Sequence, residues 1–216
     1  MNETAGRTFS IADENPAAEG CTISRAIEDS SGNTIAYFSL GQDTDISAEL
    51  YSYPKIHYVV SGTLEETGAN PATLKAGDAY LTPIDVPSGQ HATEDTVYLE
   101  IALAKDSATN LPAEAGKAFT LADAVPYADG RIVNRDLAHN AHLKLVEMAF
   151  DAGTGLSEHA APGDALLLAL DGEASVIYEG KEHAFPAGSA FKFDAGGRHA
   201  IRAGKRFKMA LLISLV

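Results

Sequence analysis

The chain has 216 residues, of which 45% are hydrophobic, so it can bury one large core or two small ones. Its 30 acidic and 16 basic side chains give a net charge of −14, which opposes binding to nucleic-acid phosphates or to an anionic membrane surface. No apolar run is long enough to cross a bilayer and no signal peptide is visible, so a cytoplasmic location is expected. Cys21 is the single cysteine and is expected to be an ordinary thiol, because an internal disulfide needs a second one.

Short apolar segments separated by turn residues follow one another along most of the chain. Residues 1–33 are a polar lead, expected to form an N-terminal arm with one or two edge strands. A first barrel is expected over 34–109, followed by a linker over 110–131 that contains the one expected helix, at 120–125, ended by Pro126. A second barrel is expected over 132–216, with a tight hairpin turn at 178–181 in which Gly180 supplies the positive φ. Many short strands at near-regular spacing predict an all-β sandwich or barrel.

The two expected barrels are copies of one pattern. Turn glycines at Gly62 and Gly172 lie 110 positions apart, and the Ala-Gly turns at Gly77 and Gly188 lie 111 positions apart. The apolar segments 97–103 and 207–213, each typical of a buried strand, keep the spacing of 110. A nearly constant offset over three features predicts an internal duplication.

The second copy contains two histidines, each preceded by a glycine at a fixed distance. The first motif is a glycine followed six positions later by a histidine, and the second is a glycine followed by an aspartate, a glycine and a histidine. These residues are Gly153 and His159, then Gly188, Asp194, Gly196 and His199. No glycine-rich phosphate loop, Gly-x-Ser-x-Gly elbow or Cys-x-x-Cys pair offers a rival chemistry.

This pair of motifs resembles that of the cupin superfamily, in which two histidines and a glutamate are followed by a third histidine. The resemblance implies an all-β fold of two tandem cupin-type double-stranded β-helix (jelly-roll) barrels, a bicupin, with His159 and His199 at the first and last metal-ligand positions. Ala161 and Ala165 stand where the second histidine and the glutamate would be, and Asp194 replaces a proline. The metal motif is therefore degenerate.

In the first copy the corresponding positions carry Glu49, Tyr51, Lys55 and Ser88, none of them histidine. Strand alternation places Glu49, Tyr51, Lys55 and His57 on one inner face. Buried charges need partners, so one hypothesis is an ion pair between Glu49 and Lys55 near the position of the missing metal. The alternative is that Lys55 reaches solvent at the barrel rim and Glu49 faces water.

Two imidazoles alone bind a divalent ion such as zinc, nickel, manganese or iron weakly, because tight sites use three or more protein donors. His142, just before the strand expected at 143–150, is the candidate for a third ligand, although the sequence leaves open which face of that strand looks inward. The predicted metal ligands are thus His159, His199 and His142. Asp164 is either a further donor, turned inward by a bulge at Gly163, or a solvated turn residue.

Two classes of function remain open. The favoured one, because half of the ligand set is missing, is a bicupin that binds a small organic molecule and has at most a weak divalent-metal site in the C-terminal barrel. The alternative is a metal-dependent cupin enzyme of the dioxygenase, isomerase or decarboxylase type, in which the ion polarises an oxygen of a small organic substrate. Either a bound metal or none fits the sequence. The expected partner is a small-molecule ligand, with no nucleic acid and no membrane, and the chain is expected to be a monomer or a homodimer.

Overall fold

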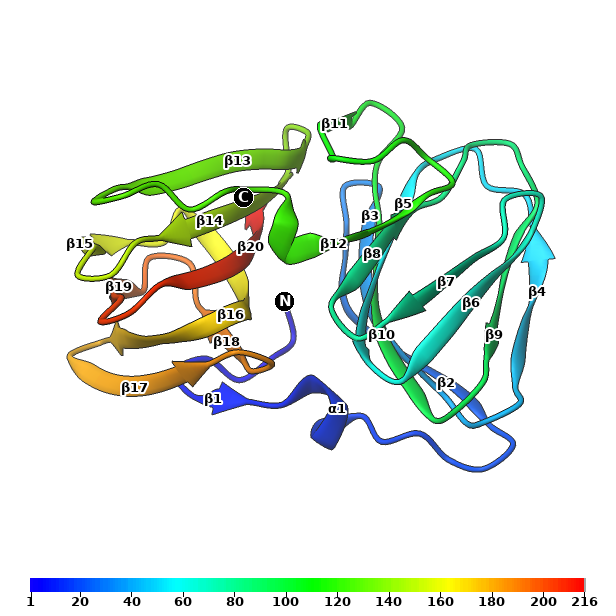
Figure 1. Ribbon diagram of the computed structural model, residues 1–216, viewed down its shortest axis with the longest axis horizontal. Coiled ribbons are helices and arrows are strands. Elements are labelled where there is room, and N and C mark those ends of the chain that lie inside the picture. The colour runs from blue at the N-terminus through cyan, green and yellow to red at the C-terminus, as the bar shows by residue number, and fades with distance from the viewer. Residues whose placement is uncertain (216) are drawn as a thin grey trace. The chain divides into compact units, whose positions relative to one another are not determined.

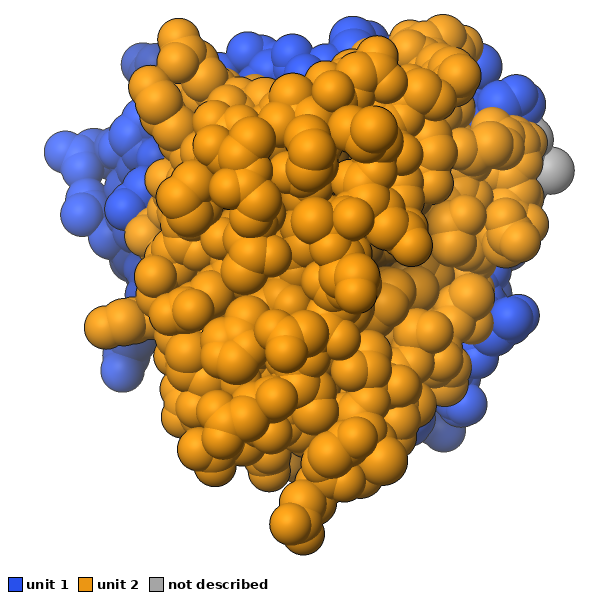
Figure 2. All heavy atoms as spheres, turned by 90° about the vertical axis from the view of Figure 1, so that its right-hand side faces the viewer, with its two compact units in different colours: residues 1–10, 108–110, 122–216 blue, residues 11–107, 111–121 orange. Residues whose placement is uncertain are grey.

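The computed structural model describes residues 1–215, and nearly all of its regular structure is β-strand (Figure 1). Helical structure in this part of the chain is limited to α1, Ile11–Glu14, and a 3₁₀ helix, Leu121–Asp123. None of these residues forms a helix that is long and apolar enough to span a membrane. The chain divides into two compact units (Figure 2). The C-terminal unit comprises Met1–Ser10, Ala108–Asn110 and Ala122–Val216, and the N-terminal unit comprises Ile11–Ser107 and Leu111–Leu121.

The N-terminal unit contains two antiparallel sheets. The larger has the strand order β12-β8-β5-β10-β3-β2 and the smaller has the order β4-β9-β6-β7. The strands are β2 Thr22–Ser30, β3 Asn33–Leu40, β4 Asp45–Glu49, β5 Lys55–Ser61, β6 Thr63–Gly68, β7 Ala72–Lys75, β8 Asp78–Leu81, β9 Ser88–Ala92, β10 Thr96–Ala102 and β12 Ala118–Thr120.

The C-terminal unit repeats this plan. Its main strand order is β1-β18-β16-β20-β14-β13-β11, in which the run from β13 to β18 matches the run β2-β3-β10-β5-β8 of the N-terminal unit. The remaining strands pair as β15 with β19, β17 with β16, and β19 with β16. The strands are β1 Thr8–Phe9, β11 Ala108–Thr109, β13 Ile132–His139, β14 Leu143–Phe150, β15 Gly155–Ala160, β16 Gly163–Tyr178, β17 Lys181–Pro186, β18 Ala190–Phe193, β19 Arg198–Arg202 and β20 Phe207–Leu215.

Strand β16 passes from one face of the C-terminal unit to the other. Its first half pairs with β18 and β20, and its second half pairs with β17 and β19. Between the halves, Gly172 has a φ of +71°, and a Cβ there would lie 2.1 Å from the carbonyl oxygen of Arg206. Only glycine fits this position, because both the positive φ and the close backbone contact exclude a side chain.

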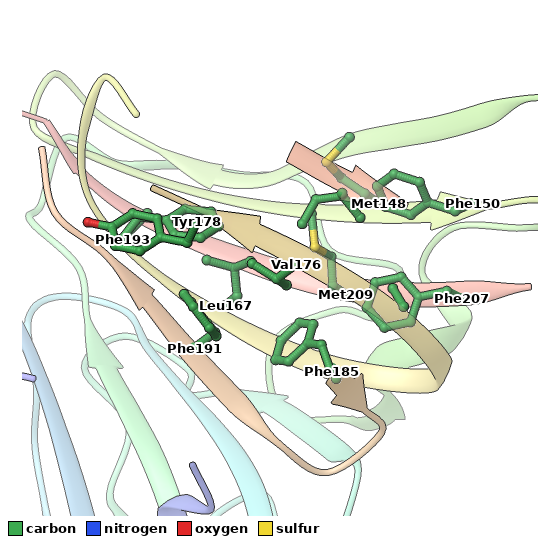
Figure 3. Packing of buried hydrophobic residues seen from close by; sticks show 14 of the residues in the cluster. Met148, Phe150, Leu167, Val176, Tyr178, Phe185, Phe191, Phe193, Phe207 and Met209 are labelled. Carbon is green, nitrogen blue, oxygen red and sulfur yellow. The ribbon is translucent and has the colours of Figure 1, made fainter. Parts of the chain in front are cut away.

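A large hydrophobic cluster lies in the interior of the C-terminal unit. Figure 3 shows aromatic rings from several strands gathered around Leu167 and Val176. The predicted inward positions Ala165, Leu167 and Ala169 are all buried in this cluster, as strand alternation requires. The aromatic members are Phe150, Tyr178, Phe185, Phe191, Phe193 and Phe207.

The interior of the N-terminal unit is apolar in one part and polar in another. Leu40, Val59, Leu64, Leu74 and Tyr98 belong to its hydrophobic cluster. Lys55, His57, Glu66 and Glu100 are buried polar side chains of the same unit.

A hairpin turn and two short helices lie in segments for which the sequence makes local predictions. The hairpin turn at 178–181 is confirmed, with φ of 49° at Glu179 and 77° at Gly180 and with Tyr178 paired to Lys181. The helix expected at 120–125 is present as the 3₁₀ helix Leu121–Asp123. The expectation of a single helix was wrong, because α1 forms within the polar lead.

Candidate functional site

The two predicted histidines of the C-terminal unit face each other on neighbouring strands. His159 on β15 is in direct cross-strand register with His199 on β19, and their ring centroids are 4.2 Å apart. His199 is buried and stacks on Phe193 with a centroid distance of 3.9 Å, whereas His159 is exposed. One ring is therefore held by the core and the other is open to solvent.

The ring nitrogens of this histidine pair are oriented in the same way. Nδ1 of His159 lies 2.8 Å from the carbonyl oxygen of Ser157, and Nδ1 of His199 lies 3.1 Å from that of Gly197. A carbonyl can only accept, so each Nδ1 carries a proton and each neutral ring keeps its lone pair on Nε2. Burial lowers the pKa of His199, and the neighbouring His159 lowers it further against the opposing effect of the Gly197 bond. Metal-binding histidines are typically held in this way, with the other ring nitrogen donating to the protein.

The third predicted ligand is elsewhere. His142 is exposed in the turn between β13 and β14, where its amide is bound by the side chain of Asn140 at 2.8 Å. Within residues 1–215, no group of three or more His, Cys, Asp or Glu side chains is arranged to hold a metal. The structure thus brings His159 and His199 together and does not bring His142 to them.

Asp164 contacts two positively charged groups and one backbone amide. Its carboxylate lies 3.1 Å from Nζ of Lys192 and accepts hydrogen bonds from the amine of Met1 and the amide of Ala195. Burial opposes ionisation, but these contacts outweigh it and lower the pKa of Asp164. The carboxylate serves as an anchor for Lys192 and the start of the chain.

The lining of the C-terminal barrel differs from the small apolar surface that the sequence predicts. Ala161 and Ala165 are buried as expected, but Tyr178, Phe191 and Phe193 fill the interior beside them. The rings of Tyr178 and Phe193 are stacked with centroids 5.3 Å apart. The histidine pair is therefore accessible from the solvent side of His159 and not through the filled interior of the barrel.

In the N-terminal unit, the predicted ion pair between Glu49 and Lys55 was wrong. Nζ of Lys55 lies 3.1 and 3.2 Å from the two carboxylate oxygens of Glu100, and the ring of Tyr51 covers it at 3.6 Å. Glu49 is exposed and accepts a hydrogen bond of 2.7 Å from the hydroxyl of Tyr51. Lys55 and Glu100 are neighbours because β5 pairs with β10, whereas Glu49 lies on β4 in the other sheet.

His57 lies at the centre of a buried network that sequence reasoning missed. Its Nδ1 contacts Glu66 at 2.5 Å and its Nε2 contacts Glu100 at 3.1 Å. Carboxylates accept hydrogen bonds, so both ring nitrogens donate and the ring is an imidazolium. Burial opposes this charge, but the attraction of Glu66 and the bonds to both carboxylates raise the pKa of His57 to about 9. Alternation placed His57 on the inner face, yet nothing local indicated its partners.

The network is neutral and nearly sealed. Glu66 also accepts hydrogen bonds from Gln90 at 3.1 Å and Ser88 at 3.4 Å. Two cations, Lys55 and His57, balance the two carboxylates. The side chains of Lys55 and Glu100 are 10% and 11% exposed, whereas those of His57 and Glu66 are at most 1% exposed. We call Lys55, His57, Glu66 and Glu100 the buried quartet.

The positions that match cupin ligands in the N-terminal unit do not fit a metal ion. Glu49 is directed to Tyr51, Ser88 to Glu66, and Lys55 brings an ammonium group to the same space. A divalent cation there would have to displace the Lys55 charge from Glu100.

Comparison with solved structures supports the fold assignment. A cupin 2 conserved barrel domain protein from Leptotrichia buccalis matches 98% of this chain and 98% of its own, with a TM-score of 0.85 and 27% sequence identity. The chain has a cupin fold. A second cupin-like match, salicylate 1,2-dioxygenase from Pseudoaminobacter salicylatoxidans in a complex with gentisate, has a TM-score of 0.63 and 12% identity over 94% of this chain and 76% of the enzyme. No family model and no curated protein matches the sequence of this cupin-fold chain.

Proposed function

We propose that the chain is a bicupin that binds a small organic molecule at a weak divalent-metal site formed by His159 and His199 in the C-terminal unit. The observation that carries the proposal is the matched orientation of the two rings. Both Nδ1 atoms are bound to carbonyl oxygens of the protein, which leaves two Nε2 lone pairs on side chains whose centroids are 4.2 Å apart. The two units with matching strand order support a tandem arrangement of barrels.

The affinity for the metal is expected to be weak because only two protein ligands are present. Nickel or zinc are the best matches to a site of imidazoles alone. Water and oxygen atoms of the organic ligand would fill the remaining positions, and the bound ion would polarise such an oxygen. The residues of the chain itself hold the two rings: Phe193 stacks on His199 and fixes it, and the exposed His159 leaves the approach open.

The metal-dependent cupin enzyme remains the second candidate. One structural neighbour is a dioxygenase by its name, but an identity of 12% shows only a common fold. The ligand set favours binding over catalysis, because Ala161 and Ala165 remove two of the four cupin ligands. Neither nucleic acid nor a membrane is proposed as a partner of a chain with a net charge of −14.

Metal titration of protein purified without a histidine tag tests the proposal. Calorimetry with Ni²⁺ is expected to give one weak site per chain, lost in the His159→Ala His199→Ala variant. His183→Ala removes another partly exposed histidine of the same unit and is expected to leave binding unchanged. His142→Ala separately tests the predicted third ligand. Equal Ni²⁺ affinity in the wild type and the double variant would contradict the proposal.

A further inference from the structure

Two basic side chains on the surface of the C-terminal unit have no acidic partner. Arg202 is exposed at the end of β19, and Lys205 is exposed in the turn between β19 and β20. Neither side chain forms an ion pair or a hydrogen bond within the part of the chain that the structure describes. By contrast Arg206, the next residue, is bound to both Asp129 and Asp151. The charges of Arg202 and Lys205 are therefore available to an anion from outside.

The two cations line one groove on the outer surface of the barrel. Arg202 is in cross-strand register with Ser175 of β16, and both sequence neighbours of Ser175 belong to the buried cluster. Because side chains alternate along a strand, Ser175 and Arg202 point outward. The groove has a volume of about 310 Å³ and is lined by Ser175, Arg202, Gly204 and Lys205, among others. A Cβ at Gly204 would meet no atom within 4 Å, so the groove reaches the backbone.

This groove is separate from the histidine pair. His199 lies near the other end of β19, and it shares the inner face of the strand with Ile201, whereas Arg202 is on the outer face. The groove is also open to solvent from the side of the sheet and does not depend on entry into the barrel interior, because its lining residues Arg202, Gly204 and Lys205 are exposed.

A second groove adjoins the first, and the two share Arg202 and Gly204. It has a volume of about 370 Å³ and is bounded on its far side by residues 153–157. Arg202 is in register with Gly155 of β15, where a Cβ would lie 2.3 Å from the carbonyl oxygen of Ile201. Gly155 therefore leaves this side of Arg202 without a side chain in register. The volume is large enough for a small organic group.

The donors at this surface match a phosphate group. Arg202 offers a planar fork of N–H groups, Lys205 a point charge and Ser175 a hydroxyl, so three residues can each reach a different oxygen. A phosphate has enough oxygens for all of them, whereas a carboxylate has two. The successive amides of Gly204 and Lys205 have no backbone acceptor within residues 1–215, and successive free amides in a turn are typical of anion sites.

We propose that Arg202, Lys205 and Ser175 form a binding site for the phosphate group of a small phosphorylated molecule, whose organic part lies in the second groove. Glu173 lines the first groove as well, so the net charge there is +1 and suits a single phosphate group. The whole chain carries a charge of −14, which repels polyanions such as nucleic acids and anionic membranes. A small monophosphate meets the local field of the two cations without extending over the acidic surface.

NMR titration of the full chain with three probes tests this site. Phenyl phosphate has a phosphate and an organic body, inorganic phosphate lacks the body, and benzoate carries a carboxylate instead. Phenyl phosphate is expected to cause saturable shifts of the amides of Ser175, Arg202 and Gly204, with both other probes binding about tenfold more weakly. Benzoate binding as tightly as phenyl phosphate would overturn the assignment to phosphate, and equal binding of inorganic phosphate would overturn the role of the second groove. If neither phosphate gives saturable shifts, there is no site.

Matched variants at exposed positions locate the site. Arg202→Gln and Lys205→Gln are each expected to weaken binding of phenyl phosphate by about fivefold to tenfold, because each removes a charged donor. Glu173→Gln is expected to strengthen it, because it removes a repelling charge from the groove. Lys181→Gln, at an exposed lysine in the hairpin turn of the same unit, is the control and is expected to have no effect. Unchanged affinity in Arg202→Gln would refute the proposal. Ni²⁺ binding is expected to stay the same in all four variants, so failure of this site is distinguishable from failure of the histidine pair.

Discussion

Glu147 offers the sharpest test of the electrostatics of the C-terminal unit. It lies on β14 opposite Arg135 of β13, its side chain is fully buried, and neither carboxylate oxygen makes a well-formed hydrogen bond. Burial raises the pKa of Glu147 from 4.5 to about 7, and the charge of Lys208 and the amide of Val125 offset burial only in part. The carboxyl group is therefore protonated in the folded protein at a pH where the unfolded chain has lost that proton.

The sign and size of the effect follow from this difference. Because the folded state holds the proton more tightly, the C-terminal unit loses stability as the pH rises from about 4.5 to about 7, and the loss is complete above pH 7. A pKa rise from 4.5 to about 7 corresponds to about 3 kcal/mol. Glu147→Gln removes this dependence. The cost of burying the amide of the variant is the same at every pH, whereas the wild type loses stability as the pH rises. The unfolding free energy of the variant minus that of the wild type should therefore be about 3 kcal/mol larger at pH 9 than at pH 4.

The methionines provide a probe for this unit alone. Met1, Met148 and Met209 are the three methionines of the chain, and all lie in the C-terminal unit. Urea unfolding followed by the NMR signals of ¹³C-methyl methionine, at pH 4 and pH 9, gives the required free energies. Glu173→Gln, at an exposed position on β16, is the control and is expected to show no such shift. If Glu147→Gln behaves like this control, Glu147 is ionised in the folded state at neutral pH and the reasoning from burial is refuted.

Three further changes test the packing and the charges. His57→Gln is expected to destabilise the N-terminal unit by about 3–5 kcal/mol at pH 6, because it leaves two buried carboxylates without their imidazolium. In the wild type this contribution is present below pH 6.5 and is lost as the pH rises through about 9. The loss is measured as the unfolding free energy derived from amide hydrogen exchange in β5 and β10. A free energy that stays constant over this pH range would argue against a charged His57. Phe191→Ala is expected to cost about 3–5 kcal/mol in the methionine assay, and a loss below 1 kcal/mol would mean that the cluster is not the main core. Gly172→Ala should destabilise the same unit through its contact with the Arg206 carbonyl and its positive φ, and an unchanged midpoint would contradict the bend in β16.

The fold was predictable because its signals are local and repeated. Turn glycines such as Gly62 and Gly172 have positive φ in the structure, and the segments 97–103 and 207–213 overlap with most of strands β10 and β20. The histidine pair was predictable for a similar reason. His159 and His199 each follow a glycine at a fixed distance, and the two strands that carry them pair in register.

The buried quartet was not predictable from local patterns. Glu66 and Glu100 reach His57 from β6 and β10, and only sheet pairing across the barrel brings them together. The expectation for Lys55 failed because alternation along the chain placed Glu49 on the same inner face, whereas Glu49 is exposed and the acidic partner, Glu100, comes from the neighbouring strand β10. Helix α1 was not predictable because its 4 residues are too few to show the hydrophobic periodicity of a helix in the sequence.

The two hydrogen bonds of the His57 ring also determine whether His57 can bind a transition-metal ion. An imidazolium that donates from both nitrogens has no electron pair to offer, and its ring is wedged between two carboxylates and the edge of Tyr98. Nickel or zinc in excess is therefore expected not to coordinate His57, the buried histidine of the N-terminal unit, below pH 9. Contaminating metal ions would leave the hydrogen bonds of the buried quartet unchanged.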